Sequence, residues 1–324
     1  MRKRIAGLLM GAAFAVACLA APWAQAQSFP NKPIRIIVPA SAGGPTDTLG
    51  RLLAKSLSEQ YGVPVVVENK AGAAGSIGVY AAVQAPPDGY TLLVSVPDAV
   101  TVYPLVRKSA PYRSTDLTPI TLVASTPYVF AVSAKLPVKT MKDFVDLSKK
   151  QKLAMATPGT GSSGHIVMEM LKERAGIELL HVPYKGAGPA VQSVIAGETH
   201  ITATSPITIK GHIDSGVLRA LAVSKAARNP VLPDVPTMIE SGFDHFDVSA
   251  WFGIFAPPGV APEIADKLDE MVRAAMKSPE YMARTAALGL EVDPVSRGNY
   301  EALLAAETGH WTQLIESANI GTEE

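Results

Sequence analysis

Short apolar runs, glycine-rich turns and helical patterns alternate along this chain. Residues 34–38 (Ile-Arg-Ile-Ile-Val) form an apolar run of the kind that becomes a buried strand. Pro39 ends that run, and Gly43 and Gly44 allow the tight turn that follows. Beyond them, leucines between positions 49 and 57 recur at helical spacing. The pattern predicts a strand, a glycine turn and a helix.

The start of this helix is the first candidate for binding chemistry. The unpaired N–H groups of a first helical turn and the positive end of the helix dipole both favour an anion. We expect Thr46 or Asp47 to be the N-cap residue. The simplest alternative is a glycine turn that only joins the strand to the helix.

Residues 63–96 repeat this alternation of strand, turn and helix. A strand is expected at 63–68, a glycine-rich turn and a helix up to about 85, and a third strand at 90–96. The order β-α-β-α-β predicts a parallel sheet with helices on its faces.

The second half of the chain shows the same pattern. After an irregular stretch (97–123), the sequence predicts strands and helices in the order of the first half. Their expected bounds are strand 122–133, helix 141–150, strand 153–157, turn 158–164, helix 165–174, strand 178–182, turn 184–188 and its helix, and strand 200–204. Strands at 218–224 and 249–256, the latter rejoining the first lobe, and helices from 262 and over 300–315 complete the chain. Two such α/β lobes predict a ligand cleft outside the carboxyl ends of their strands.

The N-terminus has the features of a secretory signal. Arg2, Lys3 and Arg4 precede an apolar run, and Ala24-Gln25-Ala26 is a small-residue cleavage site, which places the mature N-terminus at Gln27. The alternatives are a transmembrane anchor and a lipoprotein with its lipid on Cys18.

Composition narrows the function. Cys18 is the only cysteine, so the mature chain would contain no disulfide, cysteine metal site or thiol nucleophile. Removing three of the 29 basic residues leaves a small acidic excess, which gives no indication of nucleic acid as a partner. No metal-binding motif is present, and we expect neither a metal nor a cofactor.

The turn at 158–164 admits three interpretations. Gly159, Gly161 and Gly164 match the letters of a dinucleotide fingerprint, but the next strand does not end in the acidic residue that this site requires. A secreted hydrolase using Ser162 or Ser163 is the second, although the G-x-S-x-G spacing is missing. The third interpretation, that the turn binds an anion, is the most economical.

In that interpretation, Thr160, Ser162 and Ser163 supply hydroxyl groups beside a helix start. His165 either donates a further hydrogen bond or caps and packs the helix. Lys185 either neutralises a ligand carboxylate or is an ordinary exposed lysine.

Taken together, the motifs resemble one family. They are Lys32-Pro-Ile-Arg-Ile-Ile-Val-Pro39, Ala42-Gly-Gly-Pro-Thr-Asp47 with Arg51, Glu68-Asn-Lys70 with Gly72, Gly75 and Gly78, Pro87-Asp-Gly-Tyr-Thr-Leu92, Pro158-Gly-Thr-Gly-Ser-Ser163, Val182-Pro-Tyr-Lys-Gly186, Leu218-Arg-Ala-Leu-Ala-Val223, Pro233-Asp-Val-Pro-Thr237, and Trp251 with Gly253. The chain resembles the periplasmic solute-binding receptors of tripartite tricarboxylate transporters, the Bug or TctC-like proteins.

The resemblance implies an α/β, two-lobed periplasmic-binding-protein fold of type II that closes on a small carboxylate without catalysis. It implies lobe 1 over 27–123 and 248–290, lobe 2 over 124–247, and a C-terminal helix in 291–324 that packs across the lobes. A monomer that delivers its ligand to membrane permease subunits is expected.

The resemblance also implies a set of ligand-binding residues. In the first lobe these are Ser41, Gly43, Gly44, Thr46 and Asp47, and in the second Thr160, Gly161, Ser162, Ser163 and His165, with Ser95, Tyr184, Lys185, Thr204 and Ser205 as wall positions. The chain departs from the family at Ala40, where an aromatic residue is usual, and at His200, where Asp is usual. Both departures lie near the expected cleft and imply a ligand that is atypical for the family. Ala40 in particular predicts a bulkier ligand, such as an aromatic carboxylate, whereas His200 could refill the space.

Overall fold

The computed structural model describes residues 29–292, 295–317 and 320. The chain divides into a short N-terminal unit, 1–31, and a body, 32–324. The predicted signal segment and its cleavage site fall outside the described residues. The body contains both β-sheets of the protein and the helices that cover them.

The first sheet has the strand order β2-β1-β3-β10-β4. Its strands are β1 (Ile34–Val38), β2 (Val65–Asn69), β3 (Thr91–Ser95), β4 (Thr118–Pro127) and β10 (Ser249–Ala256). Strand β1 is parallel to both β2 and β3, whereas β10 is antiparallel to β3 and β4. The predicted parallel β-α-β-α-β unit is confirmed.

The second sheet has the corresponding order, β7-β6-β8-β5-β9. Its strands are β5 (Val129–Ser133), β6 (Leu153–Thr157), β7 (Leu179–Pro183), β8 (Ile201–Thr204) and β9 (Leu218–Val223). Here β6 is parallel to β7 and β8, and β5 is antiparallel to β8 and β9. The repeat predicted from the sequence is therefore a repeat of topology.

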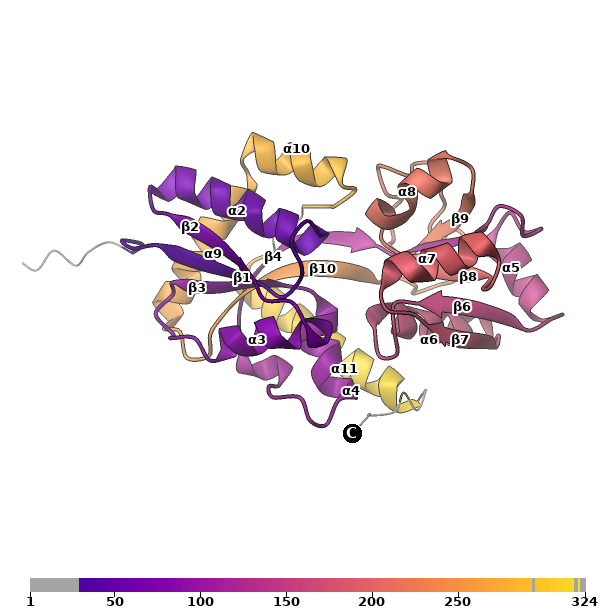
Figure 1. Cartoon of the computed structure of the whole chain (residues 1–324), viewed down its shortest axis with the longest axis horizontal. Helices are drawn as coiled ribbons and strands as arrows, with labels where there is room; N and C mark the ends of the chain where they lie inside the picture. The colour runs from indigo at the N-terminus through magenta and orange to yellow at the C-terminus, as the bar shows by residue number, and fades with distance from the viewer. Residues whose placement is uncertain (1–28, 293–294, 318–319, 321–324) are drawn as a thin grey trace, which may run out of the picture. The chain divides into compact units, whose positions relative to one another are not determined.

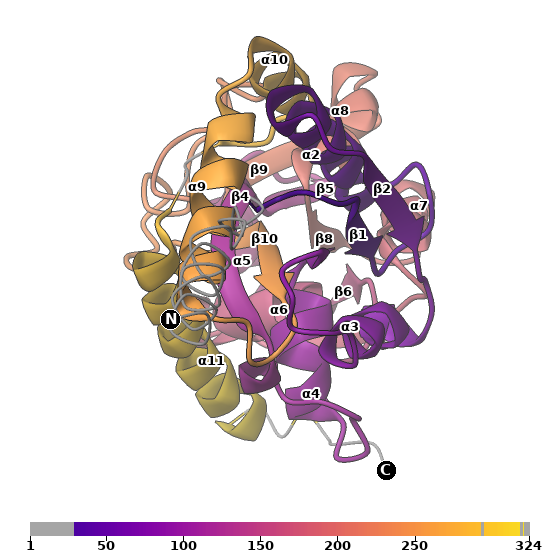
Figure 2. The same cartoon turned by 90° about the vertical axis from the view of Figure 1, so that its left-hand side faces the viewer.

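Helices cover the sheets, and Figure 1 shows α2 above the first sheet and α3 below it. The helices of the first half are α2 (Pro45–Tyr61), α3 (Ser76–Val83) and α4 (Tyr103–Val106), with short turns η1 (Ala73–Gly75) before α3 and η2 (Asp98–Val102) before α4. Those of the second are α5 (Met141–Ser148), α6 (Ser163–Ala175), α7 (Ala187–Ala196) and α8 (Pro206–Asp214). The chain ends with α9 (Pro262–Met276), α10 (Pro279–Ala287) and α11 (Arg297–Ser317). Helices α9 and α2 are in contact and lie close together in Figure 2.

Two expectations about the elements were wrong. The apolar run 122–133 is not one strand, because β4 ends at Pro127 and β5 begins at Val129 in the other sheet. The first sheet therefore extends past the expected boundary at residue 123. Helices α8 and α10 were not predicted, although each begins with the proline at its first position that favours a helix start. The other domain boundaries stay predictions.

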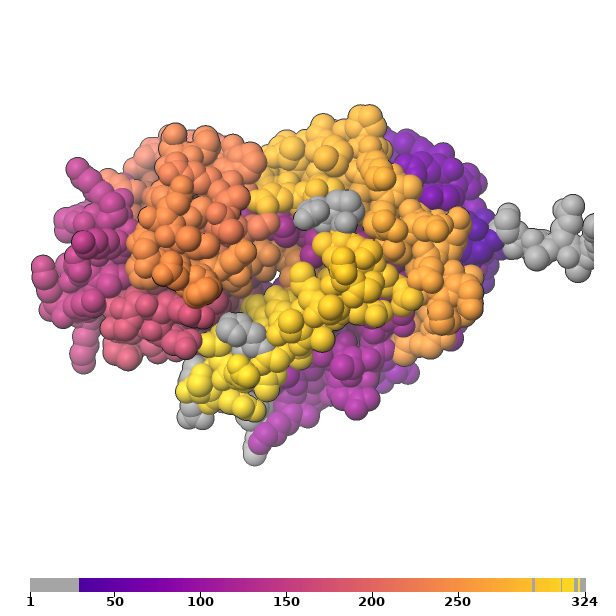
Figure 3. All heavy atoms as spheres, turned by 180° about the vertical axis from the view of Figure 1, so that it is seen from behind, coloured from indigo at the N-terminus to yellow at the C-terminus, as the bar shows by residue number. Residues whose placement is uncertain are grey.

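The long C-terminal helix α11 contacts elements of both halves. It packs against β4 of the first sheet and against α6 of the second half (Figure 3, yellow). Tyr300 near its start belongs to the apolar cluster around Trp251 and Phe255. Trp311 near its end belongs to the cluster around Phe130. One helix thus contributes to two cores.

Gly253 is a position in β10 where α11 comes very close. A Cβ at Gly253 would overlap the hydroxyl oxygen of Tyr300. Since Tyr300 is fully buried, its ring has little room to move. We predict that Gly253→Ala lowers the free energy of unfolding by about 1–3 kcal/mol, as overpacking does.

Chemical denaturation of this variant and of Gly298→Ala tests the prediction. Nothing lies within 4 Å of a Cβ at Gly298, in the first turn of α11, so that variant should be as stable as the wild type or up to about 1 kcal/mol more stable. If Gly253→Ala is as stable as the wild type, the Tyr300 ring moves aside without loss of stability.

Candidate functional site

The turn after β1 leads directly into helix α2. Gly44 is the N-cap residue in an extended conformation, and Pro45 is the first helical residue. The prediction of Thr46 or Asp47 as N-cap was therefore wrong. Glycine replaces a capping side chain here, and proline costs nothing at a position whose N–H is unpaired in any helix.

Asp47 lies in the first turn of the helix, where its carboxylate orders the preceding loop. Oδ2 accepts hydrogen bonds from the Gly43 N–H and from Arg51 Nε, both at 2.9 Å. Oδ1 accepts one from Asn69 Nδ2, also at 2.9 Å, and the same amide nitrogen donates to the carbonyl oxygen of Ala40 at 3.0 Å. Arg51 first, and then the Gly43 and Asn69 donors, hold the pKa of Asp47 at about 2 although its burial opposes this.

This network leaves several N–H groups of the turn open. Among the described residues, the N–H groups of Ser41, Ala42, Thr46 and Asp47 have no acceptor, whereas the Gly44 N–H closes the turn at 42–43 toward the Ser41 carbonyl. Ser41 and Gly43 are exposed, and Gly44 is half-buried. The first turn can therefore hydrogen-bond an anion, through backbone groups that Asp47 orders rather than through Asp47 itself.

The turn after β6 uses most of its donors internally. Ser162 is the N-cap residue of α6, and its hydroxyl accepts from the His165 N–H at 3.3 Å and donates to the Gly159 carbonyl at 2.7 Å. The Gly161 N–H donates to His165 Nδ1 at 3.1 Å. Thr160 is exposed at the tip of the turn. These internal hydrogen bonds leave fewer free groups for an anion than the first turn offers.

His165 is a packing and capping residue. Its ring is buried and stacks on that of His181, with the centroids 3.8 Å apart. Burial first, and then the charge of Lys172, lowers the pKa of His165 to about 4. Burial and the neighbouring His165 lower the pKa of His181 to about 4 as well. These contacts are those of the capping and packing role, and a hydrogen bond from His165 to a ligand stays a prediction.

A carboxylate from the first half of the chain lies at the start of α6. Asp98, three residues after β3, accepts a hydrogen bond from the Ser163 N–H at 2.7 Å through Oδ1. Burial raises the pKa of Asp98, and its contacts with Ser163 oppose the rise. The N-terminus of α6 thus already interacts with a carboxylate of the chain itself.

The predicted wall residues lie at several depths. Ser95 is fully buried at the end of β3, and its hydroxyl has no partner among the described residues. Thr204 is buried at the end of β8, and the hydroxyl of Ser205 is 3.0 Å from that of Thr208. Tyr184 is half-buried against an apolar cluster of the second sheet, whereas Lys185 is exposed. The roles predicted for these wall residues stay predictions.

The glycines of the second turn are required for close packing. A Cβ at Gly161 would lie 2.9 Å from a methyl group of Val106, and one at Gly164 would lie 2.7 Å from Cδ of Pro158. These two neighbours account for the glycine spacing without a dinucleotide.

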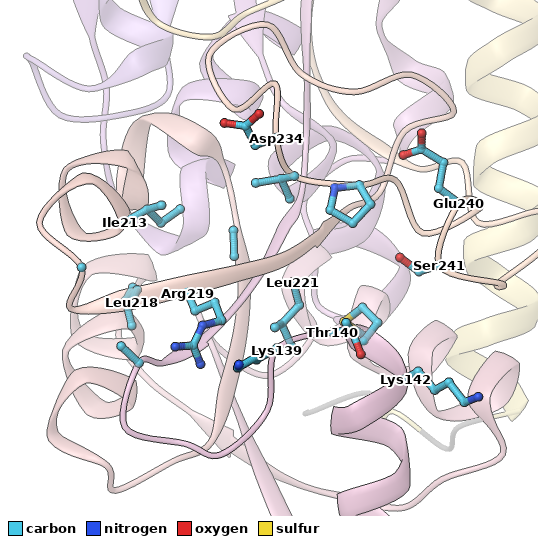
Figure 4. Close-up of a pocket in the computed structure, with 16 residues that line it drawn as sticks. Lys139, Thr140, Lys142, Ile213, Leu218, Arg219, Leu221, Asp234, Glu240 and Ser241 are labelled. Carbon is cyan, nitrogen blue, oxygen red and sulfur yellow. The ribbon is translucent and has the colours of Figure 1, made fainter.

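A large cavity lies away from both turns. It has a volume of about 690 Å³ and lies between β9 and the loop around Pro236. Lys139, Lys142, Arg219, Asp234 and Glu240 are among the residues that line it in Figure 4, and the predicted site residues are not. Its charges are mixed and some are paired, Arg219 with the Val138 carbonyl and Glu240 with Arg228.

Membrane spans and metal clusters are both absent from the described residues. In that part of the chain no helix has the length and apolar character to cross a membrane. Nor do three or more histidine, cysteine or acidic side chains there come together as a metal site would require.

Comparison with known proteins identifies the family. The model of the tripartite tricarboxylate transporter family receptor matches residues 49–320. The chain belongs to this family.

Relatives and solved structures agree with this assignment. Protein BugT of Bordetella pertussis (strain Tohama I) is 34% identical over 311 residues, covering 95% of each chain. The periplasmic binding protein BugD superposes with a TM-score of 0.76 at 33% identity, over 90% of this chain and 99% of that one. Rpa4515 of R. palustris, solved with adipate, has a TM-score of 0.79 at 31% identity, over 90% and 98%.

The family assignment confirms the α/β periplasmic-binding-protein fold and shows that the protein is a receptor, not an enzyme. The hydrolase alternative was therefore wrong, and the geometry explains why. The Ser162 hydroxyl caps α6, and Nδ1 of the nearby His165 accepts the Gly161 N–H instead of a serine proton. That nitrogen is therefore unable to act as the base that would activate the serine.

The sequence interpretation missed Asp98. It lies in the stretch that was predicted to be irregular, so it was given no role. The available signal was its position, because an acidic residue just after a buried parallel strand lies at the edge of the sheet where ligands bind.

The stacked histidines predict a stability that depends on pH. Each has a pKa of about 4 in the folded protein and 6.5 as its ordinary value. Between pH 6.5 and 4 the unfolded chain therefore binds protons that the folded chain does not, and the free energy of unfolding falls as the pH falls. We expect a loss on the order of 2 kcal/mol per histidine.

Urea unfolding at pH 7 and pH 4.5 measures this loss. The variant His181→Asn should lose less stability over the same interval than the wild type, since one of the two groups is gone. An equal loss in both proteins would show that other groups are responsible.

Proposed function

We propose that this protein is an exported solute receptor that binds a small carboxylate and delivers it to the permease subunits of a tripartite tricarboxylate transporter. The observation that carries the proposal is the turn 41–44, whose open N–H groups are held in place by Asp47. Backbone N–H groups at a helix start form a ready anion site.

The relatives support this class of ligand. Rpa4515 was solved with adipate and MatC of Rhodopseudomonas palustris with malate, and both ligands are carboxylates. In the proposed site, the ligand carboxylate accepts hydrogen bonds from the backbone of Ser41, Ala42 and the first turn of α2. Thr160 and Ser95 belong to the facing and inner walls.

Two further expectations belong to the proposal. The signal segment directs export, with cleavage before Gln27, so the mature receptor works in the periplasm, as the solved relative BugD does. It acts as a monomer and presents its bound ligand to the permease subunits in the membrane.

The role of Asp47 can be separated from its contribution to stability. Asp269 in α9 provides a matched control, since it is also buried and also pairs with an arginine four residues later, at 2.9 Å. We predict that only Asp47→Ala loses ligand affinity, by about tenfold or more, because two to three hydrogen bonds to the ligand carboxylate lose their alignment. Asp47→Ala should also lose more stability than Asp269→Ala, since Asp47 accepts hydrogen bonds from Gly43, Arg51 and Asn69 and Asp269 accepts one from Arg273.

The ligand for this comparison comes from a thermal-shift screen of mono-, di- and tricarboxylates, because a ligand that binds only the folded state raises the melting temperature. Calorimetry then measures its affinity for the wild type and both variants. An unchanged affinity for Asp47→Ala would exclude the first turn as the carboxylate site.

Ala40 predicts the size of the ligand. Its carbonyl group is held by Asn69, and its methyl side chain is half-buried where the resemblance expects an aromatic ring. A ligand with an apolar ring that fills this space would gain roughly 25 cal/mol per Å² buried, or on the order of 2 kcal/mol. We therefore expect a preference for an aromatic or otherwise bulky carboxylate over small aliphatic ones.

Calorimetry on Ala40→Phe tests this expectation with the tightest aromatic and the tightest small aliphatic ligand of the screen. The added ring should weaken the aromatic ligand much more than the small one, because only the aromatic ligand competes for the same space. Equal weakening of both would contradict it.

A further inference from the structure

A second cavity lies where the two halves of the chain meet. It has a volume of about 370 Å³, and Figure 3 shows the surface hollowed there beside α11 (yellow). Leu122 in β4 and Trp251 in β10 line it from the first sheet, and Ile166 and Met170 line it from α6 of the second half. None of the residues predicted for the carboxylate site lines it. Its volume is that of a small-molecule pocket.

Two tryptophans and one carboxylate give this cavity its chemical character. Trp251 and Trp311 are buried and both line it. Glu307 of α11 lines it as well, and its Oε2 accepts a hydrogen bond from Trp251 Nε1 at 2.5 Å. Because Glu307 is partly exposed, a ligand in the cavity can reach its carboxyl group.

Glu307 has no basic partner in the described part of the chain. Burial raises the pKa of Glu307 to about 7, and the nearby Asp98 adds to the rise, whereas contacts with Trp251 and Trp311 oppose it. The carboxyl group is therefore about half ionised at pH 7 and mostly ionised at pH 8. The charge that forms there is not balanced by any cation of the described residues.

The exposed residues of the cavity do not supply this balance. Arg174 and Asp247 line it with opposite charges, so that their fields largely cancel. His245 is also exposed and lines it as a further titratable group. The group that lacks a partner is Glu307, in a wall that is otherwise apolar and aromatic.

We propose that this cavity is a second ligand site, and that it binds a small organic cation: an ammonium group on an aromatic or aliphatic body. The ammonium group donates hydrogen bonds to Glu307, and the body packs against Trp251, Trp311 and the apolar wall. A partly buried carboxylate forms its strongest hydrogen bonds with a cationic donor. Indole rings also attract cations.

Two pairs of probes test the proposal at pH 8, where Glu307 is mostly ionised. They are phenethylamine with phenethyl alcohol, and hexylamine with hexanol. Trp251 and Trp311 are the two tryptophans of the expected mature chain, since Trp23 lies in the predicted signal segment. Tryptophan fluorescence therefore reports directly on the cavity. Each amine should bind about tenfold or more tightly than its alcohol, because only the amine forms an ion pair.

The variant Glu307→Gln retains an acceptor for the Trp251 N–H and removes the charge. It should weaken each amine by about tenfold and leave the alcohols unchanged. Glu316→Gln makes the same change at an exposed position of α11 and should bind the amines as the wild type does. Asp47→Ala should also bind them normally, since Asp47 does not line this cavity.

A second variant fills the cavity instead of changing its charge. Ala306 is exposed and lines the cavity, so Ala306→Phe adds bulk from the solvent side without entering the core. It should weaken the amine and the alcohol of each pair alike.

The affinity for the amines should also depend on pH. From pH 8 to pH 6, Glu307 changes from mostly ionised to mostly protonated, so the affinity should fall by about tenfold. Other titratable or charged groups face Glu307 or the cavity, namely Asp98, Tyr128, Tyr300, Arg174, His245 and Asp247. The variant His245→Asn, which suits the positive φ of 58° at that position, should keep the pH dependence.

The outcomes are distinct. The cation site is overturned if neither amine binds the wild type at about 1 mM, or if each alcohol binds as tightly as its amine. It is also overturned if Glu307→Gln keeps the wild-type affinity for the amines, or if Asp47→Ala loses it. None of these results affects the carboxylate receptor function, and a carboxylate screen without a hit would leave the cation site standing.

Discussion

The carboxylate of Asp47 is the interaction on which the first binding turn depends. It connects three segments of the first half of the chain. It accepts hydrogen bonds from the turn after β1, from Arg51 in its own helix and from Asn69 at the end of β2. A glycine turn without such a bond would sample many conformations, and its N–H groups would not point in one direction. The pKa of about 2 shows that the charged form is strongly favoured. The free N–H groups of the turn therefore lie beside a charged carboxylate whose two oxygens already accept hydrogen bonds from the protein.

The two halves share a topology but treat their helix starts differently. In the first half, the N–H groups at the start of α2 have no acceptor among the described residues. In the second half, Ser162, His165 and Asp98 satisfy most of the corresponding groups. An internal repeat in sequence thus need not be a repeat in chemistry. Two reasons are visible: the second turn contains the capping residues Ser162 and His165, and Asp98 comes from a distant part of the chain.

Three features connect the two sheets. The chain passes from β4 to β5 through Tyr128 alone, β10 joins the first sheet after the second has been completed, and α11 contributes Tyr300 and Trp311 to separate cores. The close contact of α11 with Gly253 shows how tightly this last connection is packed. Local sequence patterns predict helices and strands, but they do not predict such contacts between segments that are far apart in the sequence.

The sequence alone determined the order of most strands, turns and helices in both halves, since apolar runs, glycines and helical spacing are local features. It also identified the two turns, and the resemblance of its motifs pointed to the receptor family that the comparisons confirmed. Only the tertiary structure decided which donors remain open. Asp47 is not the predicted N-cap but accepts the Gly43 N–H, His165 accepts the Gly161 N–H, and Asp98 accepts the Ser163 N–H across 65 residues of sequence. A hydrogen bond depends on where two groups meet in space, and a sequence pattern records only which groups are present.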